Sequence, residues 1–363
     1  KGVNIHVFIE HMQRNFILTD VMKTGDHTKL EQFINLHSLD DQTFDLEGEY
    51  YTLHNYDLDS YDRKFAIIDC RAQNDRLKDN TEFYSELRKR CDLLHSQGFV
   101  FIKANPWESL DNINSNRQYP EIDLEHIKWT GDASWFWFYM YDKHKDNKLN
   151  FTHDHNGSYW HKKYDFLYLN KATRKHRVTL YNKLRNADVL DNSIYSFTML
   201  ETPIRLEKKY ELPGIDPKDY PRFGKDQDIT ELPYIDTVCS IVSETNDNDY
   251  EVFMTEKIWK PIMAQQVFVV HGNYLYLQRL KEIGFKTFGN YIDESYDLEQ
   301  DPEKRINKIV SLCKDLKTKN WQDIYLQTKA LRKHNYDTLF NKEKLSLEIN
   351  KTLNLFLEFA DSR

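Results

Sequence analysis

Three consecutive residues, Thr255, Glu256 and Lys257, have the types and spacing to hold a phosphorylated ligand. Thr255 suits the N-cap of a helix, which places Glu256 and Lys257 in its first turn. A helix N-terminus offers unpaired N–H groups and partial positive charge, to which the lysine adds a full charge. The carboxylate can accept hydrogen bonds from hydroxyls, as in ribose sites. The motif predicts a nucleoside diphosphate at a sheet edge, and the alternative is an ordinary capped helix.

Glycine-rich phosphate loops are excluded by the glycine content. The chain of 363 residues has only 11 glycines, and no set of them writes G-x-G-x-x-G. Gly284 and Gly289 alone have the spacing of G-x-x-x-x-G-K, and Asn290 stands where that motif needs lysine. The sequence therefore predicts neither a P-loop nor a dinucleotide-binding loop. Any phosphate has to be met by side chains and helix N-termini.

Charge and cysteine content narrow the class of protein. A net charge of −8 argues against a non-specific nucleic-acid binder, which needs a basic surface. The four cysteines form no C-x-x-C pair and are typical of a reducing compartment, so we expect a cytoplasmic protein. The densest apolar run, Ala133–Tyr141, is too short to span a bilayer, and no signal peptide is expected. Because the chain begins with Lys1, whether an N-terminal segment is missing stays open.

Alternating strands and helices have to position the residues of this motif. In the first half, apolar runs predict four strands, with a helix between the second and third of them. The segments, in the order strand, strand, helix, strand, strand, are Val3–Glu10, Phe65–Cys70, Asn80–Gln97, Gly98–Ala104 and Trp129–Tyr141. Strand–helix–strand order predicts a parallel sheet.

The same alternation returns in the second half. Strands are predicted at Tyr164–Asn170, Thr237–Ser243, Val267–His271 and Lys286–Phe288, and helices at Lys175–Asn186, Thr255–Gln265, Tyr274–Ile283 and from Pro302 onward. The proline-rich segment Thr198–Asp236 is predicted to be a long loop. The prediction is an α/β protein with an N-terminal domain at 1–160, a C-terminal domain at 161–340 that holds the expected nucleoside-diphosphate site, and a helix at 341–363 that packs back.

The segment Thr255–Gly272 resembles the donor-binding motif of glycosyltransferase family 10, the α-1,3-fucosyltransferases, in its bacterial or viral members. The shared features are Thr-Glu-Lys, an aliphatic-aromatic pair, and a strand that ends in glycine. Glu244 stands where the family has the glutamate of Glu-Asn-Ser. The resemblance implies that Glu256 and Lys257 contact the nucleotide-sugar, and Gln265 departs from the glycine usual in the family.

A second segment, Tyr164–Arg177, resembles the strand and basic turn that open the C-terminal domain in fucosyltransferase-like proteins. The resemblance implies that an arginine here contacts the donor diphosphate, and Arg174 and Arg177 are the candidates. A planar guanidinium can hold phosphate oxygens bidentately. Two alternatives stay open, a solvated basic helix start and a nucleic-acid patch. That patch would consist of Lys171, Arg174, Lys175, Arg177, Lys183 and Arg185.

A general base has to take the proton of the acceptor hydroxyl. The resemblance implies that it comes from the N-terminal domain, where Asp132 follows Gly131 and Glu10 ends the first predicted strand. The sequence does not choose between Asp132 and Glu10.

Histidines cluster in FTHDHNGSYWH, where His153, His155 and His161 match no standard zinc spacing. The resembled family also works without an essential metal. We therefore expect neither a metal nor a cofactor.

The resemblance implies a GT-B-like fold, in which two Rossmann-like α/β domains face each other across a cleft and are followed by C-terminal helices. It also implies inverting, metal-independent transfer of a sugar, fucose in the family, from a nucleoside-diphosphate sugar to the hydroxyl of a glycan or other acceptor. A GDP-sugar is the expected donor, and a bacterial cell or virus-infected host the expected setting. The alternatives are a phage-type DNA-base glycosyltransferase and a non-enzymatic glycan-binding module.

Overall fold

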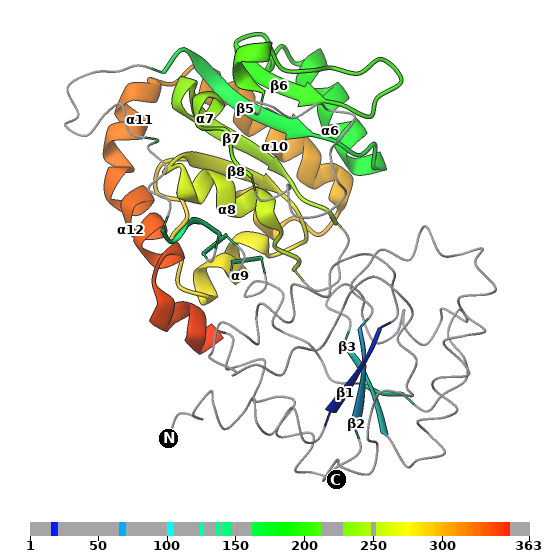
Figure 1. The fold of residues 1–363 in the computed structure, drawn as a ribbon. Coiled ribbons are helices and arrows are strands. Elements are labelled where there is room, and N and C mark those ends of the chain that lie inside the picture. Colours follow the sequence, from blue (N-terminus) through cyan, green and yellow to red (C-terminus); the bar gives the residue numbers. More distant parts are fainter. Residues whose placement is uncertain are drawn as a thin grey trace. The chain divides into compact units, whose positions relative to one another are not determined.

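The computed structural model divides the chain into two units, residues 1–131 with 349–363 and residues 132–348 (Figure 1). It describes backbone and side chains for residues 136–137, 140–141, 143–146, 151, 162–211, 228–247 and 252–348, and the backbone alone for 16–20, 65–69, 100–104 and 124–126. The predicted domain bounds at 160 and 340 stay a prediction.

The first unit contains a parallel sheet of four strands in the order β1-β2-β3-β4. The strands are β1 (Phe16–Asp20), β2 (Phe65–Asp69), β3 (Val100–Ala104) and β4 (Leu124–His126). Strands β2 and β3 confirm the predictions for their segments, whereas β1 and β4 were not predicted. The predicted strand Val3–Glu10 and helix Asn80–Gln97 lie outside the described residues.

The second unit contains a parallel sheet with the order β6-β5-β7-β8. Its strands are β5 (Tyr164–Asn170), β6 (Ser193–Phe197), β7 (Thr237–Ser243) and β8 (Val267–His271). Every residue of β7 and β8 is buried, as expected of parallel strands covered on both faces. The predicted bounds of β5, β7 and β8 are confirmed.

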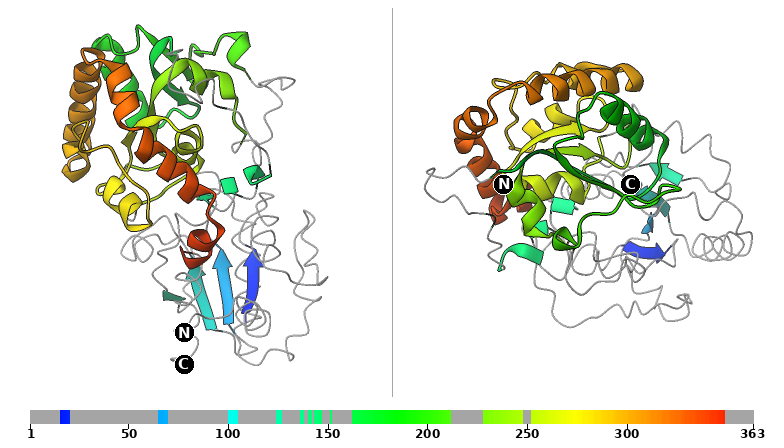
Figure 2. Two further views of the ribbon diagram at one scale, coloured as in Figure 1. Left: turned by 90° about the vertical axis from the view of Figure 1, so that its left-hand side faces the viewer. Right: turned by 90° about the horizontal axis from the view of Figure 1, so that it is seen from above.

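Helices cover both faces of this second sheet (Figures 1 and 2). Helices α6 and α10 pack together on one face, and α8 packs on β7 and β8 from the other. The helices are α6 (Lys175–Asn186), α7 (Glu231–Asp236), α8 (Glu256–Met263), α9 (Tyr276–Glu282), α10 (Pro302–Lys317), α11 (Trp321–Gln327) and α12 (Lys329–Leu339), with 3-10 turns at Lys208–Tyr210 and Ser295–Leu298. The predicted helices at α6, α8, α9 and after Pro302 are confirmed.

Side chains of β5 alternate between the two faces of the sheet. Phe166 packs edge-to-face on Trp321 of α11, and the Tyr168 hydroxyl donates to the carbonyl of Arg177 in α6 at 3.3 Å. Leu167 and Leu169 therefore point to the opposite face, on the side of α8. The two faces of this strand contact different helices.

The strand order reverses between β5 and β7. The chain leaves β5 through α6 to reach β6 on one side, and it leaves β7 through α8 to reach β8 on the other. Neighbouring strands whose helices depart in opposite directions open a crevice at their carboxyl ends, where ligands of α/β proteins bind. The carboxyl ends of β5 and β7 are therefore the expected position of a ligand-binding site.

Three predictions of local structure were wrong. The segment Trp129–Tyr141 was predicted to be a strand, but its described residues 136–137 and 140–141 are helical, because the buried Trp137 and Met140 are three positions apart. The segment Lys286–Phe288 is not a strand, since the Asn335 side chain bonds both backbone groups of Lys286, at 2.7 and 2.8 Å. The predicted loop Thr198–Asp236 ends in helix α7.

Candidate functional site

The N-termini of α6 and α8 lie at the carboxyl edge of the second sheet, one on each side of the reversal between β5 and β7. Thr255 is the N-cap of α8, and its hydroxyl accepts a hydrogen bond from the Lys257 backbone N–H at 3.4 Å. Glu256 lies in the first turn. The capped helix start predicted from the sequence is confirmed.

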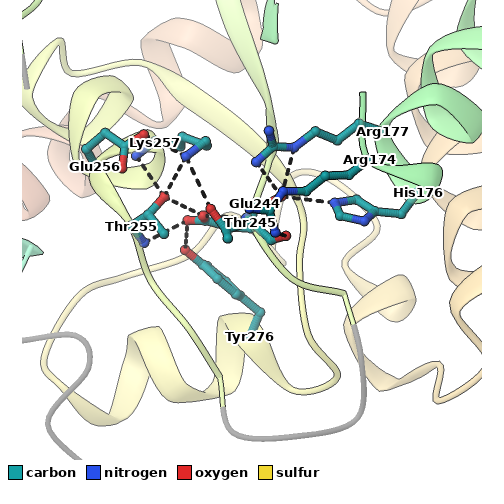
Figure 3. Close-up of polar contacts among 9 residues, drawn as sticks. All are labelled: Arg174, His176, Arg177, Glu244, Thr245, Thr255, Glu256, Lys257 and Tyr276. Atoms are coloured by element: carbon teal, nitrogen blue, oxygen red, sulfur yellow. Dashed lines mark hydrogen bonds and ion pairs between the residues drawn. The ribbon is translucent and has the colours of Figure 1, made fainter. Parts of the chain in front are cut away.

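The carboxylate of Glu244 is fully buried and holds the start of α8 in place (Figure 3). One oxygen accepts from the Thr255 backbone N–H at 3.1 Å and from the Tyr276 hydroxyl at 2.7 Å. The other accepts from the Thr255 hydroxyl at 2.6 Å and the Thr245 backbone N–H at 3.2 Å. These four donors leave the carboxylate engaged within the protein, with no exposed surface for a ligand.

The carbonyl oxygen of Glu244 is held from the side of α6. Arg177 donates to it from Nε at 3.1 Å and from Nη2 at 2.9 Å, and the His176 ring contacts it at 3.1 Å. Arg177 is 3% exposed, and burial lowers the pKa of its guanidinium while Glu244 and Glu256 oppose that shift. Residue 244 therefore connects α6 to α8, through its main chain on one side and its carboxylate on the other.

Two cations from the two helix starts converge on Thr245 (Figure 3). Arg174, the N-cap of α6, donates to the Thr245 carbonyl at 2.7 Å, and Lys257 Nζ lies 3.5 Å from the Thr245 hydroxyl. Both side chains are partly exposed. Two positive charges, each from the start of a helix, thus lie at the same residue, and groups of this kind are suited to bind phosphate oxygens.

Glu256 forms an ion pair with Lys257, with Oε1 and Nζ 2.6 Å apart. Its side chain is 13% exposed. Burial by itself would raise the pKa of this carboxyl, but the charges of Lys257 and Lys260 outweigh burial and lower the pKa to about 2. Glu256 is therefore ionised at neutral pH and can accept hydrogen bonds from hydroxyls.

A cavity of about 420 Å³ opens beside this cluster. Among the residues singled out from the sequence, Lys171, Glu256 and Lys257 line it. Arg174, Arg177, Glu244 and Thr255 are not among its lining residues. Thr255, Glu244 and Arg177 are instead buried and position the groups that face the crevice.

Polar residues end three neighbouring strands of the sheet, a feature that the sequence analysis missed. Asn170, Ser243 and His271 are the last residues of β5, β7 and β8, and all three are buried. Burial lowers the pKa of the His271 imidazole well below its ordinary value, and the charges of His176, Arg305 and Arg177 lower it further. In the sequence, each of these three residues could have been recognised as a polar residue that ends an apolar run. No sequence pattern indicates that Tyr276 contacts Glu244.

The basic residues near α6 do not form one free patch. Arg177 is buried, and Lys183 contacts Glu303 at 3.2 Å and Asn307 at 2.6 Å. The geometry therefore does not favour the nucleic-acid alternative.

Several predicted residues lie outside the described part of the chain. These are Asp132, Glu10 and the three clustered histidines, His153, His155 and His161. Within the described residues, no group of three histidine, cysteine or acidic side chains is placed to hold a metal ion. None of the described helices combines the length and apolar character needed to cross a bilayer.

Comparisons with known proteins gave one likeness of fold. No protein-family model and no curated protein matches the chain. Among solved structures, the chain is similar to one described as the crystal structure of an alpha1,3-fucosyltransferase, with 9% sequence identity, 97% of each chain covered and a TM-score of 0.41. A TM-score this low supports no argument, so the function has to be inferred from the site itself.

Proposed function

We propose that this protein is a glycosyltransferase that moves a sugar from a nucleoside-diphosphate sugar to an acceptor hydroxyl. The observation that carries the proposal is the convergence of Arg174 and Lys257, from the starts of two helices, on Thr245, together with the cavity of about 420 Å³ that Lys257 and Glu256 line. The site lies where the strand order reverses, the usual ligand position in such sheets. A GDP-sugar is the proposed donor.

In the proposed reaction, the diphosphate is the leaving group. Negative charge grows on its oxygens as the bond to the sugar breaks, and Lys257, Arg174 and the N–H groups of the two helix starts stabilise that charge. The ionised Glu256 accepts hydrogen bonds from ribose or sugar hydroxyls. A carboxylate takes the acceptor proton, with Asp132 and Glu10 as the two candidates, and a single displacement inverts the sugar without a metal ion.

Calorimetric titration with GDP, UDP and ADP tests the proposal. We expect at least one of them to bind, and Lys257→Ala to weaken that binding about 10-fold or more, because a hydrogen bond to a charged group contributes about 1.5–3 kcal/mol. Lys183→Ala is the matched control, since Lys183 pairs with Glu303 on the protein surface. Absence of binding to all three, or equal affinity in Lys257→Ala and the wild type, would refute the proposal.

A further inference from the structure

The cavity extends from the carboxyl edge of the sheet onto its face. Its lining includes all four residues from Ser240 to Ser243, a stretch of β7 that spans about 10 Å at roughly 3.3 Å per residue. On the neighbouring strands it reaches Leu167 and Leu169 of β5 and Ser196 of β6. The charged lining residues Lys171, Glu256 and Lys257 lie toward the edge, and Arg205, Glu211, Asp228 and Lys260 also line the cavity. On the sheet itself, Leu167, Leu169 and Val242 give the cavity an apolar floor.

The sheet face is open here because the helices on that side cover other parts of it. Helix α7 runs directly into the first residue of β7 and therefore lies at the amino ends of the strands. Helix α8 packs on β7 and β8. Over the carboxyl halves of β5 and β6, the cavity lies between the strands and residues of the segments 198–211 and 228–230.

Two strand residues show that the opening reaches the sheet. Leu169 is only half-buried although β5 has a neighbouring strand on each side. Ser196 pairs with Leu169 in the register and faces the same side; it is 7% exposed, and its hydroxyl makes no hydrogen bond to any residue that the structure describes. Because Ser196 lines the cavity, its hydroxyl is available to bond a ligand there.

We propose that the inner part of this cavity binds the heterocyclic base of the nucleoside diphosphate, with the Ser196 hydroxyl bonded to an edge of the base. This inference rests on the proposed function, which places the diphosphate at the mouth. A base is flat, uncharged and largely apolar on its faces, and it carries donors and acceptors only at its rim. The apolar side chains of Leu167, Leu169 and Val242 suit its faces, and the ionised Glu256 suits the ribose between base and diphosphate.

The proposal separates base recognition from diphosphate recognition, and two variants test that separation by calorimetry. Leu169→Trp places a ring in the inner cavity, and we expect it to weaken nucleoside diphosphates more than 10-fold while inorganic pyrophosphate binds as in the wild type. Ser196→Ala removes one oxygen atom, and we expect a 3- to 10-fold loss for nucleoside diphosphates alone. Ser193→Ala is the matched control, because that hydroxyl, also on β6, donates to the Val189 carbonyl at 3.1 Å.

The outcomes distinguish this inference from the proposed function. If nucleoside diphosphates bind both variants as tightly as they bind the wild type, the base subsite is refuted, and the proposed function is not affected. A wild type that binds pyrophosphate and every nucleoside diphosphate equally would also overturn it. A wild type that binds none of these ligands would refute the proposed function itself. Should Leu169→Trp fail to fold, Ser196→Ala decides the question.

Discussion

Two glutamates at the candidate site occupy opposite environments and have different tasks. Glu256 lies at the cavity wall, where neighbouring lysines keep its carboxylate ionised for a ligand. Glu244 has no exposed surface and accepts four hydrogen bonds from the protein. We therefore regard Glu244 as a positioning residue, whose carboxylate sets the place of the α8 N-terminus relative to α6.

Glu244→Gln tests this positioning role. The amide cannot accept at its nitrogen, so two of the four donors lose their partner, and we expect the free energy of unfolding to fall by about 2–3 kcal/mol. Nucleotide affinity should fall as well, because the helix start that carries Lys257 loses its support. Chemical denaturation and calorimetric titration measure the two effects.

Glu282→Gln is the control for this change, because Glu282 is exposed and its pair with Arg279 is at the surface. It should change stability by about 0.5 kcal/mol or less. A Glu244→Gln protein as stable as this control would contradict the role assigned to the carboxylate.

At the scale of elements, the sequence predicted those strands and helices whose pattern is local. The apolar runs of β5, β7 and β8 are bounded by polar residues, and the amphipathic spacing of α6 ends at recognisable positions. Strand β6, SIYSF, was missed because two serines interrupt its apolar pattern. One of them, Ser196, lines the cavity. The polar residue that made this strand hard to predict is therefore part of the candidate site.

The site could be predicted in part for the same reason. Thr255, Glu256 and Lys257 form one local motif, and the structure places them together at a helix start. The contacts of Glu244 with Tyr276 and of Arg177 with Glu244 join residues 32 and 67 positions apart. Such pairings depend on the strand order and have no local signal.

Two adjacent glutamines after α8 give a test at the scale of this element. Gln265 has a positive φ of 51°, a left-handed conformation that glycine adopts without strain. The Gln266 side chain is buried and bonds the hydroxyl of Ser240 at 2.5 Å and backbone groups of Tyr234 and Thr237 at 2.8 and 2.9 Å. We therefore expect the Gln265 conformation to destabilise the fold and the Gln266 side chain to stabilise it.

We expect Gln265→Gly to raise the free energy of unfolding by up to about 1 kcal/mol, the strain released less the extra freedom of the unfolded chain. Gln266→Ala should lower it by about 3 kcal/mol or more, because it leaves several buried groups without partners. Urea denaturation of the two variants measures both changes. Effects of the same sign would show that the strain at Gln265 is offset by a contact of its side chain.

At the scale of the whole molecule, residues that precede β5 in the chain complete the core of the second unit. Trp137 is fully buried, stacks on Trp259 with ring centroids 5.9 Å apart, and meets Phe285 at 4.9 Å. Its indole N–H donates to the carbonyl of Leu339 at 2.7 Å. One side chain thus connects α8, the segment after α9 and the end of α12.

Trp137→Ala should destabilise the second unit by about 3–5 kcal/mol, the usual cost of removing a buried tryptophan. Because a chain with two units need not unfold in one step, hydrogen exchange at the amides of β5 and β7 is the appropriate measurement, and we expect it to accelerate about 100-fold or more. Tyr141→Ala is the control, since Tyr141 is only half-buried. Equal exchange in the two variants would show that the unit does not depend on this tryptophan.

The alternation of side chains along β5 has a consequence for how this protein can evolve. Phe166 and Tyr168 face α11 and α6 and hold the fold together, whereas Leu167 and Leu169 face the cavity. Substitutions at the second pair can accumulate under selection for another base while the first pair keeps the sheet intact. The cations proposed to bind the diphosphate, Arg174 and Lys257, belong to helix starts and are not affected by such substitutions. If the proposed function holds, donor specificity can therefore change during evolution through single substitutions at Leu167 or Leu169, without loss of the fold.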